Sequence, residues 1–207
     1  MALANEELAR TPVIKVFGIG GAGSNIVNRL IASDIGPFDS YVCINTDKSI
    51  LEHSHATTMI VLGTGEPLTG QPPGNSEKLA FAKRDLIMKT IDGADIVVVI
   101  AGLGGNAGTG IAPLVANFGR RSGALVFALV TTPFSFEGIN RNLAADKGLV
   151  MTQINAHYTT AISNAAIGDS LDDDTSIRDA FRASDDAVGH HLKFVLGSLN
   201  QNWHFQR

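Results

Sequence analysis

Short apolar runs alternate with longer amphipathic stretches along the chain. The apolar runs, of strand length, lie near residues 13–18, 40–45, 57–62, 95–101, 124–131 and 157–163. The amphipathic stretches, of helix length, lie near residues 21–33, 75–91, 108–120, 136–153 and 175–199. This alternation predicts an α/β fold, in which helices cover both faces of a Rossmann-like, doubly wound and mainly parallel sheet. In the common strand order of such sheets, 3-2-1-4-5-6, the first and fourth strands are neighbours.

A glycine-rich segment over residues 101–110 (AGLGGNAGTG) joins the most apolar predicted strand to the next helix. Glycines in such a turn let backbone N–H groups converge without Cβ atoms in the way, and the helix dipole adds partial positive charge. Phosphate is therefore the expected ligand. The alternative is tight packing of the strand against the helix, which accounts for one or two glycines but not for five.

A second glycine loop over residues 18–25 (GIGGAGSN) follows the first predicted strand. Gly18, Gly20 and Gly23 satisfy the G-x-G-x-x-G dinucleotide fingerprint, and Asp47 lies at the end of the next strand, where a ribose-binding acid is found. A dinucleotide-dependent enzyme is therefore one hypothesis. However, both glycine loops leave the carboxyl ends of predicted neighbours, so two helix N-termini would point at one site. That arrangement favours a polyphosphate over a single pyrophosphate.

Composition and charge narrow the class of protein. The chain has 207 residues, 44% of them hydrophobic, and no long apolar run, which predicts one domain with a sizeable core and no membrane segment. A net charge of −4 with scattered lysines and arginines argues against a nucleic-acid partner. The single cysteine, Cys43, and the lack of an apolar signal core after Met1 predict a cytoplasmic protein. We expect a flexible segment over residues 1–11, and a Pro- and Gly-rich lid over residues 63–75.

Further motifs occur in a fixed order along the chain. They are GIGGAGSN over 18–25, NTD over 45–47, GGNAGTG over 104–110, TPFSFEG over 132–138 with Arg141, and ISN over 162–164 followed by Asp179-Ala180-Phe181 and Asp186. Together they resemble the nucleotide loops of FtsZ, the bacterial relative of tubulin, including the family signature GGGTGTG and the ribose loop TxPFxFEGxxR. The resemblance extends from about Pro12 to about Asn200. It implies a tubulin/FtsZ-type GTPase domain over residues 12–207, with GTP or GDP as ligand and a cytoskeletal or cell-division role.

The chemistry of the loops agrees with this resemblance at the phosphates and the ribose. Backbone amides would hold the phosphates, and the Thr109 hydroxyl could donate a further hydrogen bond. The residues expected around the phosphates are Gly20, Gly21, Ala22, Asn25, Gly104, Gly105, Asn106, Ala107, Gly108, Thr109 and Gly110. By resemblance, Pro133, Glu137 and Arg141 would contact the ribose. Glu137 and Arg141 are also spaced four residues apart, as in a simple exposed ion pair on a helix.

Guanine would be recognised by residues from the C-terminal part of the chain. Asn164 offers an amide to guanine O6 or N7, and the Asp186 carboxylate can accept from guanine N1–H and the N2 amine, a pattern that adenine cannot match. Phe181 would offer a stacking face for the base. Alternatively, Phe181 belongs to the core, because it also fits the apolar spacing of its helix.

The sequence predicts no metal site. The acidic run over residues 172–174 suits a helix start, and the histidines have no cysteine partners with which to bind zinc. Asp47 is either a Mg²⁺ or ribose contact or the cap of the next helix. Mg²⁺ therefore stays open as a companion of the nucleotide.

Two departures from the family pattern limit what the resemblance implies. Asn106-Ala107 replaces the usual Gly-Thr, and the hydroxyl missing at Ala107 weakens the phosphate cradle. The sequence stops at Arg207, before the loop that activates water on the neighbouring subunit's GTP and before the family's C-terminal domain. We therefore expect a GTPase that is slow or dependent on self-assembly, or a nucleotide-binding structural or regulatory module without turnover. No catalytic residue is assigned. The expected partner is a second copy, in a dimer or polymer, or a full-length family member.

Overall fold

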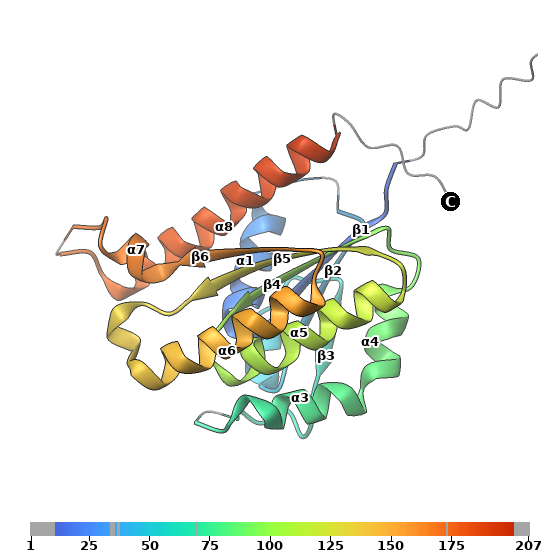
Figure 1. The fold of residues 1–207 in the computed structure, drawn as a ribbon, viewed down its shortest axis with the longest axis horizontal. Helices are drawn as coiled ribbons and strands as arrows, with labels where there is room; N and C mark the ends of the chain where they lie inside the picture. The colour runs from blue at the N-terminus through green and yellow to red at the C-terminus, as the bar shows by residue number, and fades with distance from the viewer. Residues whose placement is uncertain (1–10, 34–35, 37, 69, 173, 201–207) are drawn as a thin grey trace, which may run out of the picture.

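The structure is a computed structural model that describes residues 11–33, 36, 38–68, 70–172 and 174–200. Within these residues six parallel strands form one sheet in the predicted order, β3-β2-β1-β4-β5-β6 (Figure 1). The strands are β1 (Ile14–Ile19), β2 (Ser40–Asn45), β3 (Thr58–Val61), β4 (Ile96–Gly102), β5 (Leu125–Thr132) and β6 (Tyr158–Ser163). Apart from Thr11, the predicted flexible segment over residues 1–11 lies outside the described residues.

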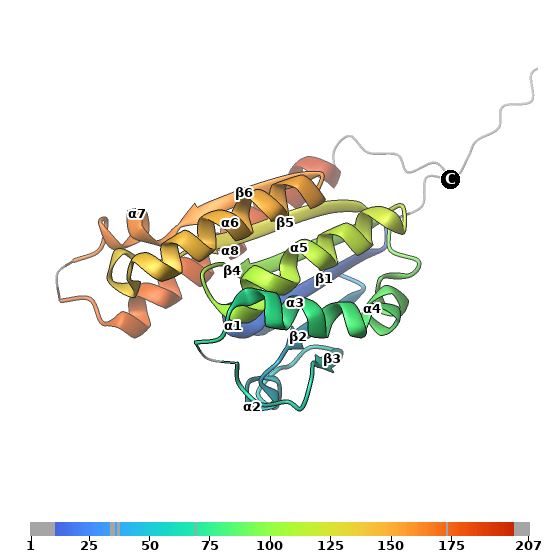
Figure 2. The same ribbon diagram turned by 60° about the horizontal axis from the view of Figure 1, so that its bottom comes forward.

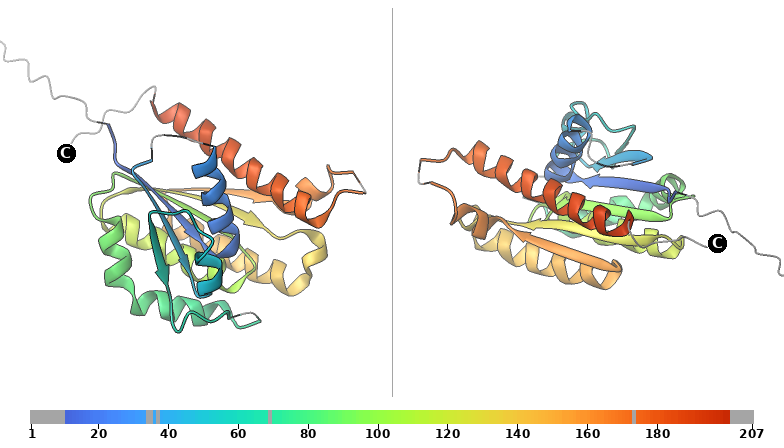
Figure 3. Two further views of the ribbon diagram at one scale, coloured as in Figure 1. Left: turned by 180° about the vertical axis from the view of Figure 1, so that it is seen from behind. Right: turned by 90° about the horizontal axis from the view of Figure 1, so that it is seen from above.

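Helices cover both faces of the sheet, as Figures 2 and 3 show. One face carries α3 (Pro73–Ala82), α4 (Arg84–Ile91), α5 (Asn106–Arg121) and α6 (Ile139–Asn155), and the other carries α1 (Gly20–Ala32), α2 (Lys48–Leu51) and α8 (Ile177–Asn200). In β4, Val97 and Val99 belong to the core on the α5 side, while Val98 and Ile100 belong to the core on the α1 side. Because successive side chains point to opposite faces, a strand buried on both faces is apolar throughout.

Two of the predicted helices are divided in the structure. The stretch near 75–91 forms α3 and α4, because Lys83 between them leaves helical geometry (φ −103°, ψ 15°). The stretch near 136–153 begins as a 3-10 turn, η1 (Ser135–Glu137), and α6 starts only after Gly138, whose φ of +95° is incompatible with a helix. The short helices α2 and α7 (Asn164–Gly168) escape prediction, since four or five residues carry too little periodicity.

The fold brings distant segments together at the carboxyl edge of the sheet. Helix α8 packs against α1, α7, β5 and β6, so its first turns lie near the end of β5 (Figure 1). The loops after β1 and β4 reach the same edge, because both strands are central and parallel. None of the described helices is long and apolar enough to cross a membrane.

Candidate functional site

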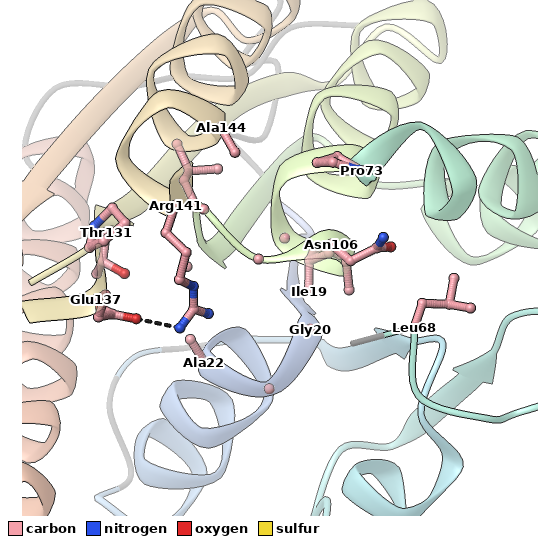
Figure 4. A pocket seen from close by; sticks show the side chains of 18 of the residues that line it. Ile19, Gly20, Ala22, Leu68, Pro73, Asn106, Thr131, Glu137, Arg141 and Ala144 are labelled. Carbon is pink, nitrogen blue, oxygen red and sulfur yellow. Dashed lines mark hydrogen bonds and ion pairs between the residues drawn. The ribbon is translucent and has the colours of Figure 1, made fainter. Parts of the chain in front are cut away.

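A cavity of about 730 Å³ lies at the carboxyl ends of β1, β4 and β5, where the two glycine loops meet (Figure 4). In this view Arg141 and Glu137 lie on one side of the glycine loops, and Leu68 and Pro73 lie on the other. Residues from β2 and α2, from the segment that leads into α3, and from α6, α7 and α8 complete the lining. The cavity thus lies at the switch point of the sheet, where doubly wound folds bind ligands.

Most of the site residues expected from the sequence line this cavity. Those that do are Gly20, Gly21, Ala22, Gly104, Gly105, Asn106, Ala107, Gly108, Pro133, Glu137, Arg141, Asn164 and Phe181. Four do not line it: Asn25, which is exposed on α1, the buried Thr109 and Gly110 on α5, and Asp186 on α8.

The N-termini of α1 and α5 both open into the cavity without a cap. Neither helix has a side-chain hydrogen bond at its N-cap, and neither carries an acidic residue in its first turn. Helices α3, α4 and α6 also lack a side-chain cap, whereas Asp47 caps α2 and Ser163 caps α7. What sets α1 and α5 apart is that their first turns are formed by the two glycine loops. The first amides of a helix have no acceptor within the helix, and the dipole makes this end partly positive. Two uncapped helix starts therefore offer amide donors and positive potential to one anionic ligand.

The glycines of the two loops fall into two groups. Seven are required by the fold. Gly20 and Gly104 have φ of +70° and +94°, and a Cβ at any of the others would collide with a neighbouring backbone or side-chain atom. These others are Gly18, Gly23, Gly102, Gly108 and Gly110. Packing therefore explains more of these glycines than the sequence indicated.

The second group consists of Gly21 and Gly105, which packing does not require. A Cβ at Gly21 would lie 3.5 Å from Ile50 Cδ1, and one at Gly105 would lie 3.5 Å from Arg141 Nη2, both ordinary contacts. Both glycines line the cavity. The fold does not need them, so their missing side chains keep space open for a ligand.

The Thr109 side chain stabilises the glycine loop over residues 101–110 by a hydrogen bond to its backbone. Its Oγ1 accepts a hydrogen bond of 2.8 Å from the Gly104 amide. The Gly104 amide, which the sequence assigned to phosphate, therefore already has an acceptor. The first amides of α5, at Asn106, Ala107 and Gly108, are the donors that this loop directs toward the cavity.

Asn45 is a cavity residue that the sequence left out of the expected site. It ends β2 and is 3% exposed, and its Oδ1 accepts from the amides of Thr46 and Asp47 at 2.8 and 3.2 Å. Its Nδ2 is buried and has no hydrogen-bond partner. An unpaired buried donor is costly, so this amide points to an acceptor supplied by a ligand. The available signal was a polar residue at the end of a parallel strand, within the NTD motif.

Asp47 caps α2, as one of the two sequence interpretations proposed. Its Oδ1 accepts from the Ser49 amide at 2.9 Å and from the Ser49 hydroxyl at 2.6 Å. It also lines the cavity. Among the described residues no group of three or more His, Cys, Asp or Glu side chains is placed to hold a metal ion. The described residues therefore hold no site in which protein side chains alone could bind a metal ion.

The sequence predicted a lid over residues 63–75, but residues 73–75 are the first turn of α3. Several described residues of this segment line the cavity. Asn106 Nδ2 donates to the carbonyl oxygens of Gln71 and Pro72 at 2.8 and 2.7 Å, and Ser76 Oγ donates to the Asn106 carbonyl at 2.7 Å. Asn106 Oδ1 is buried without a partner. The asparagine that departs from the family signature thus ties this segment to the start of α5.

Glu137 and Arg141 form an ion pair, but not the exposed pair on one helix that their spacing predicted, because Glu137 lies in η1 and Arg141 in α6. Both also line the cavity. Arg141 Nη1 lies 2.5 Å from Glu137 Oε2, and Glu137 Oε1 accepts from the Phe134 amide at 2.9 Å. The carboxylate is 9% exposed, whereas the guanidinium side chain is 52% exposed. The buried carboxylate therefore holds the exposed guanidinium along one wall (Figure 4).

The structure corrects the position of the carboxylate expected at the base. Asp186 does not line the cavity, because it points to α1 and forms an ion pair with Arg29. Asp185 lines the cavity instead. Residues four apart share a helix face, so Asp185, and not Asp186, lies on the same side of α8 as Phe181. Helical phase, which the motif alone does not resolve, explains the difference of one residue.

The ionisation of Asp185 is perturbed by its surroundings. Burial raises the pKa of Asp185 to about 6, the Arg29 guanidinium opposes this rise, and the Asp186 carboxylate adds to it. Nearby, the Ser184 hydroxyl donates to Asn164 Oδ1 at 2.5 Å, which leaves the Asn164 side-chain amine for other partners. Asn164 itself is 4% exposed and lines the cavity.

The sequence left open whether Phe181 belongs to the core or offers a stacking face to the base, and in the structure its ring does both. Its ring meets the buried Phe134 edge to face at a centroid distance of 5.0 Å. It is nevertheless 39% exposed and lines the cavity. Phe134 thus fixes the orientation of a ring that remains accessible to a planar ligand.

Comparison with known proteins shows the family. Residues 13–172 match the model of the Tubulin/FtsZ family, GTPase domain. The cell division protein FtsZ of Pseudomonas putida is 35% identical over 193 residues, which cover 92% of this chain and 48% of that protein. FtsZ of Rickettsia conorii is 36% identical over 188 residues, covering 89% and 41%. The chain therefore spans about half the length of the curated relatives it matches.

Solved structures agree with this result. An empty FtsZ dimer from M. jannaschii superposes with a TM-score of 0.86 at 30% identity, covering 95% of this chain and 58% of that chain. The GTPγS-bound protofilament of CetZ2 from Haloferax volcanii gives 0.79 at 22% identity, covering 90% and 59%, and so supports the fold alone.

Proposed function

This chain belongs to the tubulin/FtsZ family, and we propose that it binds GTP and GDP in the cavity between the starts of α1 and α5. The observation that carries the proposal is the pair of uncapped helix N-termini that open into one cavity. Two such ends suit a di- or triphosphate, which carries several negative charges in a row. A dinucleotide with a single pyrophosphate would use only one of them.

The phosphates are held mainly by backbone amides. The first turns of α1 and α5 supply these amides, and Gly21 and Gly105 leave the approach open. The unpaired Asn45 Nδ2, which belongs to the cavity lining, donates to a phosphate oxygen. Mg²⁺ usually binds through one or two carboxylates together with substrate phosphates. Asp47 is the carboxylate on this side of the cavity and would hold it.

The base and the ribose occupy the opposite end. Asp185, in place of Asp186, accepts from guanine N1–H and the N2 amine, and Asn164 pairs with O6 or N7. Phe181 stacks on the base. Glu137 and Arg141 contact the ribose, with their ion pair keeping both side chains at the cavity wall.

Hydrolysis of GTP by this chain is slow or depends on self-assembly. Three carboxylates line the cavity within the described residues, and each already has a role: Asp47 caps α2, Glu137 pairs with Arg141, and Asp185 lies at the base. A general base for water must therefore come from outside this lining, such as from a second copy, and such a base is typically worth 10²–10⁴-fold in rate. The second candidate is a nucleotide-binding module without turnover.

Turnover measured against protein concentration separates these two candidates. Phosphate release from GTP and light scattering are recorded together over a hundredfold range of concentration of the 207-residue chain. Specific activity that rises with concentration, alongside scattering, supports catalysis across an interface between copies in a dimer or polymer. Release that never exceeds the uncatalysed rate supports the module without turnover. Brisk, concentration-independent turnover by a monomer would contradict both.

A further inference from the structure

Arg29 joins α1 to α8 directly beside the base end of the cavity. Its Nη2 donates to Asp186 Oδ1, and the two side chains are 33% and 49% exposed. Asp185 precedes Asp186 on the same helix and lines the cavity. One guanidinium therefore acts on two adjacent carboxylates, of which only Asp185 faces the ligand.

The charge on Asp185 decides which purine it can accept. An ionised carboxylate only accepts hydrogen bonds, which suits the N1–H and N2 amine donors of guanine. A protonated carboxyl has one O–H donor and one acceptor, and this pattern suits the N1 acceptor and N6 amine donor of adenine. Protonation of Asp185 would therefore exchange a guanine-selective group for one that tolerates adenine.

We propose that Arg29 is a specificity-determining positioning residue, which keeps Asp185 ionised and thereby keeps the cavity selective for guanine over adenine. This inference rests on the proposed function. Arg29 does not line the cavity; it acts through Asp185 while its own hydrogen bond goes to Asp186.

The groups around Asp185 support this assignment. Its pKa of about 6 is set by burial, with Arg29 lowering it and Asp186 raising it. The polar side chains packed beside it, Asn164 and Ser184, are uncharged. Asp47 and the Glu137–Arg141 pair line other walls of the same cavity. Arg29 therefore supplies a positive charge that opposes protonation of Asp185, and a nearby opposite charge commonly changes a carboxyl pKa by about 1–3.

The test measures the ratio of GDP to ADP affinity between pH 5 and pH 8, by competition against a fluorescent GDP. Titration of the phosphates is common to both nucleotides and cancels in the ratio. In the unaltered chain the ratio falls as pH drops and Asp185 becomes protonated, by up to tenfold per pH unit, and the midpoint of this fall moves with the pKa of Asp185. Arg29→Met raises the midpoint of this fall by about one pH unit or more, whereas Arg29→Lys leaves it nearly unchanged.

Asp186→Asn distinguishes an electrostatic role from a structural one. It breaks the same ion pair, but it removes a negative charge beside Asp185 and frees Arg29, so the midpoint moves down instead of up. Loss of a half-exposed pair costs little stability, and circular dichroism checks that each variant is folded. If Arg29→Met did not fold, the midpoints of Arg29→Lys and Asp186→Asn would still show whether Arg29 influences the protonation of Asp185.

Three results would overturn the inference. Midpoints that move in the same direction in Arg29→Met and Asp186→Asn would show that the pair only holds the helices together. Unchanged midpoints in both variants would show that Arg29 has no influence on the base contact. A chain that binds ADP as well as GDP at pH 8 would overturn the proposed function as well as this inference.

Discussion

Replacing Asp185 by asparagine tests the base contact with very little change in shape. The carboxylate lines the cavity on the face of α8 that carries Phe181. An asparagine side chain still accepts from guanine N1–H, but its amine then faces the guanine N2 amine, donor against donor. Xanthine has a carbonyl oxygen at that position, which accepts from the new amine. The Asp185→Asn variant should therefore prefer xanthine nucleotides to guanine nucleotides.

The size of this change follows from the burial of the site. An unsatisfied buried donor costs about 1–3 kcal/mol, and a hydrogen bond to a charged group contributes about 1.5–3 kcal/mol. GDP affinity should fall by roughly 10- to 100-fold, since about 1.4 kcal/mol corresponds to a factor of ten. Affinity for xanthosine diphosphate should rise above that of the unaltered chain, as one clash is replaced by one hydrogen bond.

The same substitution should stabilise the ligand-free chain at neutral pH. Because the pKa of Asp185 is raised to about 6 from 3.8, the contribution of this carboxyl to stability is fully present below about pH 3.8 and is lost as pH rises through 6. At pH 7.5 its buried charge costs of the order of 1–2 kcal/mol after solvent screening. Asp185→Asn removes this cost, so Tm should rise by roughly 2–8 °C at pH 7.5 and much less at pH 4.

Two measurements test this reasoning. Competition binding compares the affinities for GDP and xanthosine diphosphate, and thermal unfolding at pH 7.5 and pH 4 compares the Tm values. Asp186→Asn is the matched control, because Asp186 lies outside the cavity lining. An Asp185→Asn variant that keeps full GDP affinity and gains none for xanthosine diphosphate would refute the reasoning. Inverted selectivity in Asp186→Asn would show instead that the sequence-based assignment was correct.

Four further changes probe the phosphate end. Gly105→Ala should lower GDP affinity about tenfold or more in titration calorimetry while leaving Tm nearly unchanged, because a Cβ fits there only when no ligand is bound. Gly110→Ala is its counterpart: it should lower Tm, since the new Cβ collides with the Pro73 carbonyl. Asn45→Asp keeps both hydrogen bonds to backbone amides but replaces the unpaired amine by an anionic oxygen. This oxygen repels phosphate, so GTP affinity should fall at least tenfold. An unchanged affinity would mean that the phosphates bind elsewhere. Asn106→Ala should destabilise the chain by about 1–2 kcal/mol and speed amide hydrogen exchange around residues 71–73. Unchanged exchange there would mean that the Asn106 side chain does not hold this segment to the start of α5.

The sheet could be predicted because a doubly wound fold produces a clear alternation of apolar strands and amphipathic helices along the sequence. Strands buried on both faces are continuously apolar, as Val97 to Ile100 are, and each is followed by a helix with one apolar face. The order 3-2-1-4-5-6 follows from the few topologies that right-handed crossovers permit. The break at Lys83 was beyond prediction, since neither glycine nor proline marks it.

Most of the residues that the sequence assigned to the site line one cavity, and the exceptions have local causes. Asp186 was chosen from the order of motifs along the chain, but the phase of α8 turns Asp185 toward the cavity and Asp186 toward Arg29. Thr109 and Gly110 belong to the signature, yet Thr109 accepts a hydrogen bond from the Gly104 amide and Gly110 allows α5 to pack closely against α3. Asn45 can be recognised only when the hydrogen bonds of its side chain are counted, and that requires coordinates.

The central claim is that the cavity is a guanine nucleotide site, and titration calorimetry of the 207-residue chain tests it most directly. GDP, ADP and NADH are titrated separately at pH 7.5, where Asp185 is ionised. The account predicts one GDP site per chain and ADP binding that is weaker by about a hundredfold or more, since adenine leaves buried polar groups unpaired. Equal affinities for GDP and ADP, or NADH binding that GDP does not displace, would contradict it.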